Sequence, residues 1–454
     1  MKKFAQIAAG VLIAGAAASV GLACCGADGA LDLMKYYAAI GTVGAAAVFC
    51  LAAFVSPRVR RSPALMALHL GLALVLGGWV YNEFAGPRDG YLRLRAGQAG
   101  RVAEENAPAT DGFVLEVKDF TIDRWADTGT VRQYVCSASV EKTDADGTTF
   151  ATPETISVNH PLVKDGWWVY QTSYEELENP HTGEPLYFTI LQCVKDVGLP
   201  GVALGGLLLV LGAFLYQFRA CTATRSLVPA VGEPFSRASR VVLGLYGFLL
   251  AGTVSMLVHR ALATGHPPLQ NMYEFLMCAS VFIPLLTFCD MRRRRERDRV
   301  RTLLVDAALE TLVLMPVCFF MDGRVKHLMP ALQSPFFIPH VGAYVIGYIF
   351  LVRAALGVGV RTVATGFFLL TLGLVLGAAW GKVCWGHWWQ FDPKEMWSLA
   401  TWLVYAAYFH MRPRLSVRAE RAFLIAGAVM VVLTLTWINL SRLFTGMHSY
   451  ASEG

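Results

Sequence analysis

Residues 198–217 read GLPGVALGGLLLVLGAFLYQ, a run of 20 residues without a charged side chain. An α-helix rises about 1.5 Å per residue, so such a run spans the roughly 30 Å hydrocarbon core of a bilayer. Similar runs recur along the chain. They predict an α-helical polytopic membrane protein with about 11 transmembrane helices, near 4–24, 36–55, 63–82, 198–217, 238–262, 271–289, 302–321, 340–357, 362–381, 394–410 and 421–440.

The overall composition supports this class. Of 454 residues, 55% are apolar and only 16% are charged, and the mean hydropathy is +0.47. In soluble globular proteins, about a quarter of all residues are charged. The net charge of +6 does not indicate nucleic-acid binding, because Lys and Arg cluster in short blocks beside apolar runs. The ten cysteines form no CxxC pair, so neither a zinc site nor a disulfide framework is predicted.

The positions of basic residues predict the orientation. When the predicted spans simply alternate, every basic loop lies on one side, which the positive-inside rule assigns to the cytoplasm. The N-terminus is then cytoplasmic and the C-terminus lies outside. Met1-Lys2-Lys3 and the apolar run to Ala23 also fit a cleaved signal peptide, but we favour an uncleaved first span. The basic residues on which this orientation depends are Arg58, Arg60, Arg61, Arg219, Arg225, Arg292 to Arg295, Arg297, Arg299, Arg301, Arg353, Arg361, Arg412, Arg414, Arg418 and Arg421.

One long segment, at 84–197, interrupts the spans and is predicted to lie on the outer side. It alternates apolar and polar residues, as in VLEVKDF at 114–120 and YVCSASV at 134–140, and turn signals punctuate it. This pattern predicts a small β-rich extracytoplasmic domain of antiparallel strands. The expected organisation is a membrane segment at 1–83, the β-rich domain at 84–197, a fourth span with a cytoplasmic linker at 198–234, and a second membrane domain at 235–454.

A Trp-rich segment at 380–397 reads WGKVCWGHWWQFDPKEMW. Its tryptophans, at 380, 385, 388, 389 and 397, have two interpretations. They could form an aromatic belt at the membrane interface, or a flat platform for a large planar ligand, with Lys382, Lys394 and Asp392 as polar contacts. Asp392 and Pro393 also fit the N-cap and first position of a helix.

Four histidines are placed where they could act as ligands. His69 falls within a predicted span, His340 at the start of the eighth, His410 at the inner end of the tenth and His448 in the tail. Two neutral imidazoles can hold one haem iron from opposite faces. An ionisable group inside a span is costly unless it is paired or functional, which favours a role for His69. His410 could instead be an interface residue, and His340 and His448 ordinary loop histidines.

These motifs resemble a known family. Residues 385–397 resemble the tryptophan-rich "WWD" signature of haem-handling proteins in cytochrome c maturation. GHPPLQNMYE at 265–274, LQS at 332–334 before His340, YFHMR at 408–412 and HSY at 448–450 are similar to the CcsA (ResC) branch. LHLGL at 68–72, VNHPL at 158–162 and YQTSY at 170–174 resemble its partner CcsB (ResB). The chain therefore resembles a CcsBA-type fusion, the cytochrome c synthetase of system II.

The resemblance implies a function and a set of site residues. His69 and His410 would take haem b from the inner side, and His340 and His448 would then hold it beneath Trp380, Trp385, Trp388, Trp389, Asp392 and Trp397. The family is a haem lyase type of enzyme that joins haem vinyl groups to the CxxCH thiols of an exported apocytochrome c. The implied location is the bacterial cytoplasmic membrane, with apocytochrome c, haem and thiol-reducing proteins as partners. No protein nucleophile is needed, because the reaction mainly requires positioning.

Two other functions fit part of the pattern. A haem exporter or carrier would share the WWD signature without bonding haem to protein, although the ResB-like half favours a synthetase. A respiratory subunit with bis-histidine haem would need both histidine pairs on facing helices. The expected outer pair lies in loops, which disfavours electron transfer across the bilayer.

Overall fold

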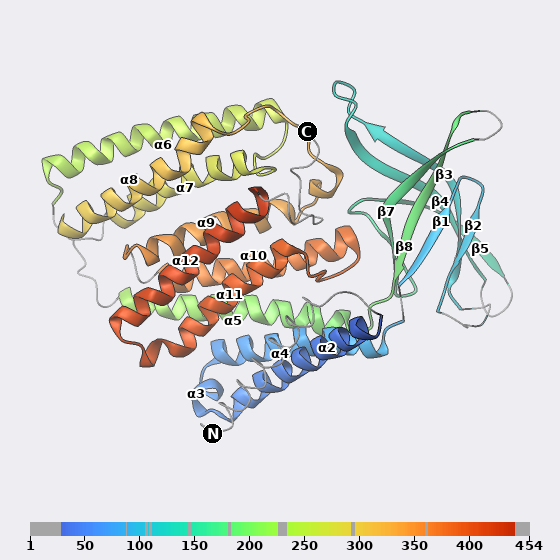
Figure 1. Ribbon diagram of the computed structural model, residues 1–454, viewed down its shortest axis with the longest axis horizontal. Coiled ribbons are helices and arrows are strands. Elements are labelled where there is room, and N and C mark those ends of the chain that lie inside the picture. Colours follow the sequence, from blue (N-terminus) through green and yellow to red (C-terminus); the bar gives the residue numbers. More distant parts are fainter. Residues whose placement is uncertain are drawn as a thin grey trace.

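The computed structural model describes residues 29–87, 89–104, 108, 111–143, 148–179, 183–225, 234–291, 296–358 and 362–440. A helical part and a β part lie side by side (Figure 1). The predicted first span at 4–24 and His448 fall outside the described residues.

Seven helices of the described chain are long and apolar enough to cross a membrane. All seven coincide with predicted spans, so the polytopic membrane class is confirmed. They are α4 (Pro63–Ala85), α5 (Leu199–Arg225), α6 (Arg237–Thr264), α7 (Met272–Met291), α8 (Glu296–Phe319), α9 (Phe337–Ala355) and α10 (Thr362–Trp385).

The predicted number of about 11 spans is not confirmed. The segments at 36–55, 394–410 and 421–440 do form helices, but these are not among the seven. Lys394 and Glu395, in the first turn of the helix that covers 394–410, lower its apolar character. The three helices are α2 (Gly29–Ala52), α11 (Pro393–Met411) and α12 (Val417–Leu440).

Helices α4 and α5, which precede and follow the β part, pack with their backbones in close contact. A Cβ atom on Gly71 would lie 2.7 Å from the Gly205 carbonyl oxygen, and one on Gly205 would lie 2.6 Å from that of Gly71. Small residues are favoured where membrane helices approach closely, since dispersion contacts drive their association. This packing brings both ends of the β part back to one place.

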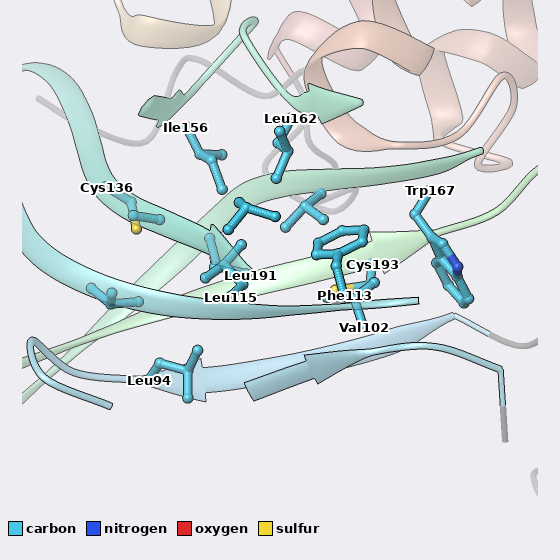
Figure 2. Close-up of a cluster of buried hydrophobic side chains, with 14 of the residues drawn as sticks. Leu94, Val102, Phe113, Leu115, Cys136, Ile156, Leu162, Trp167, Leu191 and Cys193 are labelled. Atoms are coloured by element: carbon cyan, nitrogen blue, oxygen red, sulfur yellow. The ribbon is translucent and has the colours of Figure 1, made fainter. Parts of the chain in front are cut away.

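The predicted β-rich domain is a sandwich of two four-stranded antiparallel sheets, with strand orders β1-β8-β7-β6 and β2-β3-β4-β5. Its core mixes side chains from both sheets, including Leu115, Ile156 and Leu191 (Figure 2). Burial raises the pKa of Cys136 to about 11 and that of Cys193 to about 12, so both remain unreactive thiols. The strands are β1 (Gly90–Leu94), β2 (Ala99–Val102), β3 (Phe113–Arg124), β4 (Val131–Thr143), β5 (Thr149–Ser157), β6 (Leu162–Lys164), β7 (Trp167–Glu178) and β8 (Pro185–Val194).

A buried ion pair joins α8 and α9. Arg353 is fully buried, and its guanidinium donates from Nε and Nη2 to the Asp306 carboxylate at 2.9 Å for both bonds. Asp290 on α7 accepts a third bond of 3.0 Å. Arg353 was counted above as a loop charge, but it is an internal partner of two carboxylates and carries little weight for orientation.

Replacing Arg353 by Leu should destabilise the helical part. The change leaves Asp306 buried without its cation, which typically costs about 3–5 kcal/mol, and the melting temperature of the purified protein in detergent should fall. The double variant Arg353→Leu/Asp306→Leu should recover part of the loss. Arg324→Leu, which breaks an exposed pair with Asp322, is the matched control and should change little. Equal melting temperatures for Arg353→Leu and Arg324→Leu would contradict this account.

Candidate functional site

His69 on α4 and His410 on α11 lie together, although 341 positions separate them in the sequence. Their ring centroids are 6.1 Å apart and the ring planes make an angle of 75°. The Nδ1 atom of His69 donates to the Leu65 carbonyl at 2.8 Å, and that of His410 to the Ala406 carbonyl at 2.7 Å. A carbonyl can only accept, so each neutral imidazole carries its lone pair on Nε2. This is the tautomer that a metal-binding histidine needs.

This pair lies far from the β-sandwich. His69 is 16 residues from the end of α4 that enters the sandwich, a distance of about 24 Å along a helix. His410 is 17 residues from the start of α11, or about 25 Å. The pair therefore marks the end of the helical part opposite the sandwich and the Trp-rich segment.

His340 lies at the sandwich end, in the first turn of α9 rather than in a loop. Its Nδ1 donates to the Gly373 carbonyl on α10 at 2.7 Å, so its lone pair is also on Nε2. The ring contacts Tyr344 at 5.0 Å and Trp380 at 5.7 Å between centroids. The predicted proximity of His340 to the Trp-rich segment is thus borne out by contact. Its expected partner, His448, is outside the described residues.

Gly377 provides the space for the His340 ring. A Cβ atom at this position would lie 2.5 Å from His340 Cε1 and 2.8 Å from Nδ1. Any larger residue would therefore push the imidazole out of its bond to Gly373. Sequence reasoning missed Gly377, since a glycine inside an apolar helix carries no signal that tells packing from chance.

The tryptophans of the Trp-rich segment differ in environment. Trp380 is 2% exposed, and its Nε1 donates to the Ala331 carbonyl at 3.0 Å, so it is a packed residue beside His340. The Trp385 ring centroid lies 5.3 Å from that of Trp380, and the two ring planes are tilted by 41°. Trp388 has a buried Nε1 without a hydrogen-bond partner in the described chain. Trp385, Trp388, Trp389 and Trp397 are all partly exposed, as residues of an aromatic platform or of an interfacial belt would be.

Asp392 has a structural role in this segment. Its carboxylate accepts from the Lys394 backbone N–H at 2.8 Å, and Glu395 accepts from the Asp392 backbone N–H at 3.2 Å. Together they form a capping box at the start of α11, with Pro393 at the first position. The capping interpretation of Asp392 is confirmed, and its carboxylate fixes the point where the loop enters the helix.

The β-sandwich contacts the Trp-rich segment through a buried lysine. Lys382 Nζ lies 2.6 Å from the Asp196 carboxylate and donates to the Gly386 carbonyl at 2.9 Å. The same ammonium lies 5.3 Å from the Trp168 ring and 5.5 Å from the Tyr170 ring, both on β7. Lys382 is a possible ligand contact in one of the two interpretations of the Trp-rich segment; in the structure its ammonium joins the two parts of the chain.

Two histidines without an assigned role also lie in this contact. His387 Nε2 lies 2.9 Å from Gln192 Nε2 and 3.2 Å from the Asp89 carboxylate. His327, in the loop before α9, lies 2.7 Å from Asp127, and this contact lowers the pKa of the Asp127 carboxyl. Sequence reasoning gave these histidines no partner, because the partners are 195 to 298 positions away and depend on how the sandwich docks.

Comparisons with known proteins find family matches to two segments of the chain. Residues 357–448 match the family described as Cytochrome C assembly protein, and residues 61–184 match the ResB-like family. A protein named cytochrome c biogenesis protein CcsA from Prochlorococcus marinus subsp. pastoris is 26% identical over 293 residues, covering 53% of this chain and 91% of the relative. Its counterpart in Synechococcus sp. is 29% identical over 280 residues, covering 48% and 87%. That of Chlamydomonas reinhardtii is 29% identical over 252 residues, covering 46% and 67%.

The fold and its histidine positions define a multi-pass membrane protein with a β-sandwich docked on one end of its helices. The family matches then identify the two parts. The chain combines a ResB-like part with a cytochrome c assembly part of the CcsA type in one polypeptide, which confirms the predicted fusion.

Asp196→Asn should loosen the contact between the sandwich and the Trp-rich segment. The change leaves a buried ammonium without its counter-ion, which is strongly unfavourable. Amide hydrogen exchange over residues 385–392 should become faster. Asp165→Asn is the control, since it breaks a partly exposed pair with Lys142 at 2.9 Å, and such pairs contribute about 0–1 kcal/mol. Unchanged exchange at 385–392 in Asp196→Asn would show that this pair does not hold the contact.

Proposed function

We propose that this protein is a cytochrome c synthetase, which binds haem b at an inner and an outer site and attaches it to apocytochrome c. The observation that carries the proposal is the pairing of His69 and His410. His69 and His410 would hold the haem iron through Nε2, since two metal–imidazole bonds of about 2 Å plus half of each ring span about 6 Å. The observed separation is 6.1 Å, and both rings keep Nε2 for a metal.

The outer site is proposed around His340, with His448 as the second ligand on the strength of the family resemblance. His340 meets the same tautomer requirement through its bond to Gly373. Trp385, Trp388, Trp389 and Trp397 would cover the porphyrin plane, while buried Trp380 supports the His340 ring. Asp392 supports the site by capping α11.

The proposed reaction depends more on the positioning of its two reactants than on an activated side chain of the protein. Thioether formation adds a cysteine S–H across a haem vinyl group, so the sulfur bonds one carbon, the hydrogen goes to the other and nothing is released. Holding both reactants in a reactive orientation can lower the barrier by several kcal/mol, about 7–11 in the best cases. The proposed substrate is a CxxCH apocytochrome whose thiols are kept reduced by partner proteins.

The proposed membrane is the bacterial cytoplasmic membrane, with the β-sandwich and the Trp-rich segment on the outer face. About 24 Å of helix lies between His69 and the sandwich end of α4. Arg412 and Arg414, next to His410, support a cytoplasmic position for the His69–His410 end. An inner site that receives haem and an outer site that presents it would then lie on opposite sides of the bilayer.

The proposal is tested by co-expression with a CxxCH apocytochrome in a host without its own maturation genes. We expect covalent haem that survives a denaturing gel. Haem that co-purifies with the membrane protein while no covalent product forms would indicate a carrier instead. A colourless purified protein, together with maturation that is indifferent to His69, His340 and His410, would refute haem handling altogether.

Replacing His410 by Ala should remove the inner ligand pair while leaving His340 in place. We expect the haem content of the purified protein to fall several-fold and maturation to fall with it. His410→Gly with added imidazole should restore both, because a free imidazole can occupy the vacated ligand position. His266→Ala, a change in a loop histidine outside both sites, is the control and should retain haem.

Gly377→Ala should displace His340 without weakening α10. Alanine is the better helix former by about 1 kcal/mol, yet its Cβ would lie 2.5 Å from the His340 ring. Maturation should therefore fall while the melting temperature is kept or raised. Gly342→Ala on α9 is the matched control, since a Cβ there meets nothing within 4 Å. Full activity of Gly377→Ala would show that His340 does not depend on this packing.

A further inference from the structure

Asn159 occupies an unusual turn between β5 and β6 of the sandwich. Its backbone is left-handed, with φ of +67°, and the residue is only 7% exposed. Among residues with a side chain, asparagine tolerates this conformation best, but glycine adopts it most easily. The backbone conformation alone would thus favour glycine at this position. The presence of asparagine indicates a role for its side-chain amide.

The amide reaches out of the sandwich to the helical part. Asn159 Nδ2 lies 2.8 Å from the Pro330 carbonyl, 3.2 Å from that of Ala331 and 3.2 Å from that of Gln333. These carbonyls belong to the short turn η2 (Pro330–Leu332) and the residue after it. One buried side chain thus binds the whole turn. Gln333 returns the contact by donating from Nε2 to the Arg132 carbonyl of the sandwich at 2.9 Å.

The same turn binds the tryptophan beside His340. The Ala331 carbonyl, which Asn159 contacts, also accepts the bond from Trp380 Nε1 at 3.0 Å. The Trp380 ring lies 5.7 Å from the His340 ring and 5.8 Å from Phe337, at the start of α9. A shift of the η2 turn would therefore move both the indole that supports His340 and the helix start that carries it.

We propose that Asn159 is a positioning residue for the outer haem site, and that the β-sandwich acts through it as a clamp on His340. This inference rests on the proposed function, because it concerns the outer ligand of that function. Asn159 does not touch the substrate. It holds one carbonyl that Trp380 shares, so the ResB-like part sets the geometry of a ligand in the CcsA-like part. A displacement of about 1 Å at a reacting group can cost 100-fold in rate.

The decisive variant is Asn159→Gly, which keeps the left-handed backbone and removes only the amide. Asp165→Gly is the matched control, since Asp165 has φ of +53° in a neighbouring turn and its side chain binds Lys142 of the sandwich. Both changes are made in the full chain. His340→Gly is the reference, because the haem that it loses is the haem of the outer site.

Asn159→Gly should lose the same haem absorption as His340→Gly, and its yield of mature cytochrome should fall at least tenfold. Amide hydrogen exchange over 330–340 should become faster, whereas the inner-pair haem of the otherwise unchanged chain should persist. Asp165→Gly should change none of these. If Asn159→Gly does not accumulate, Trp380→Phe tests the same carbonyl, because it keeps a ring and removes the N–H; it should show the same loss.

Two contrary results are distinguishable. If Asn159→Gly behaves like Asp165→Gly while His340→Gly abolishes outer-site haem, the clamp is refuted and the proposed function stands. If His340→Gly itself leaves haem binding and maturation unchanged, the outer site is refuted and the clamp with it.

Discussion

A single kind of hydrogen bond, from imidazole Nδ1 to a backbone carbonyl, underlies the chemistry assigned to this protein. His69, His410 and His340 each make it, with Leu65, Ala406 and Gly373. Because a carbonyl cannot donate, the bond selects one tautomer and leaves the lone pair on Nε2, the atom through which the proposed haem iron would be bound. The first two bonds lie within a single helix and need no tertiary structure. The third crosses from α9 to α10, so the His340 ring depends on how these helices pack and on the absence of a side chain at Gly377.

The sandwich and the helices meet through buried polar contacts, and this has a consequence for how the two family parts work together. Lys382 contacts Asp196, and Asn159 holds the η2 turn. Buried polar contacts are costly to open once one partner is lost. A ResB-like part and a CcsA-like part joined in this way would act as one unit at the proposed outer site. The sandwich would then contribute to that site through its surface contacts, although its apolar core lies elsewhere.

The charged side chain of Arg353, inside the spans, is also paired with polar partners. Arg353 is buried among α7, α8 and α9 and is compensated by Asp306 and Asp290. Ionised groups persist in such surroundings only when they are paired. Basic residues near span ends are therefore of two kinds, those in solvent that report orientation and those inside that hold helices together. A count of arginines in the sequence does not distinguish the exposed arginines from the buried, paired ones.

The sequence by itself determined the membrane class, seven apolar helices, the β-rich insertion and the N-cap at Asp392, because these depend on local runs, alternation and capping chemistry. It also indicated His69, His340 and His410, since an imidazole beside or within an apolar span is conspicuous. Only the tertiary structure decided that His69 and His410 meet, that Trp380 and Lys382 are buried, and that Asn159 and Gly377 matter. Those facts depend on pairs of residues far apart in the chain, and no periodicity records which distant surfaces will be brought into contact.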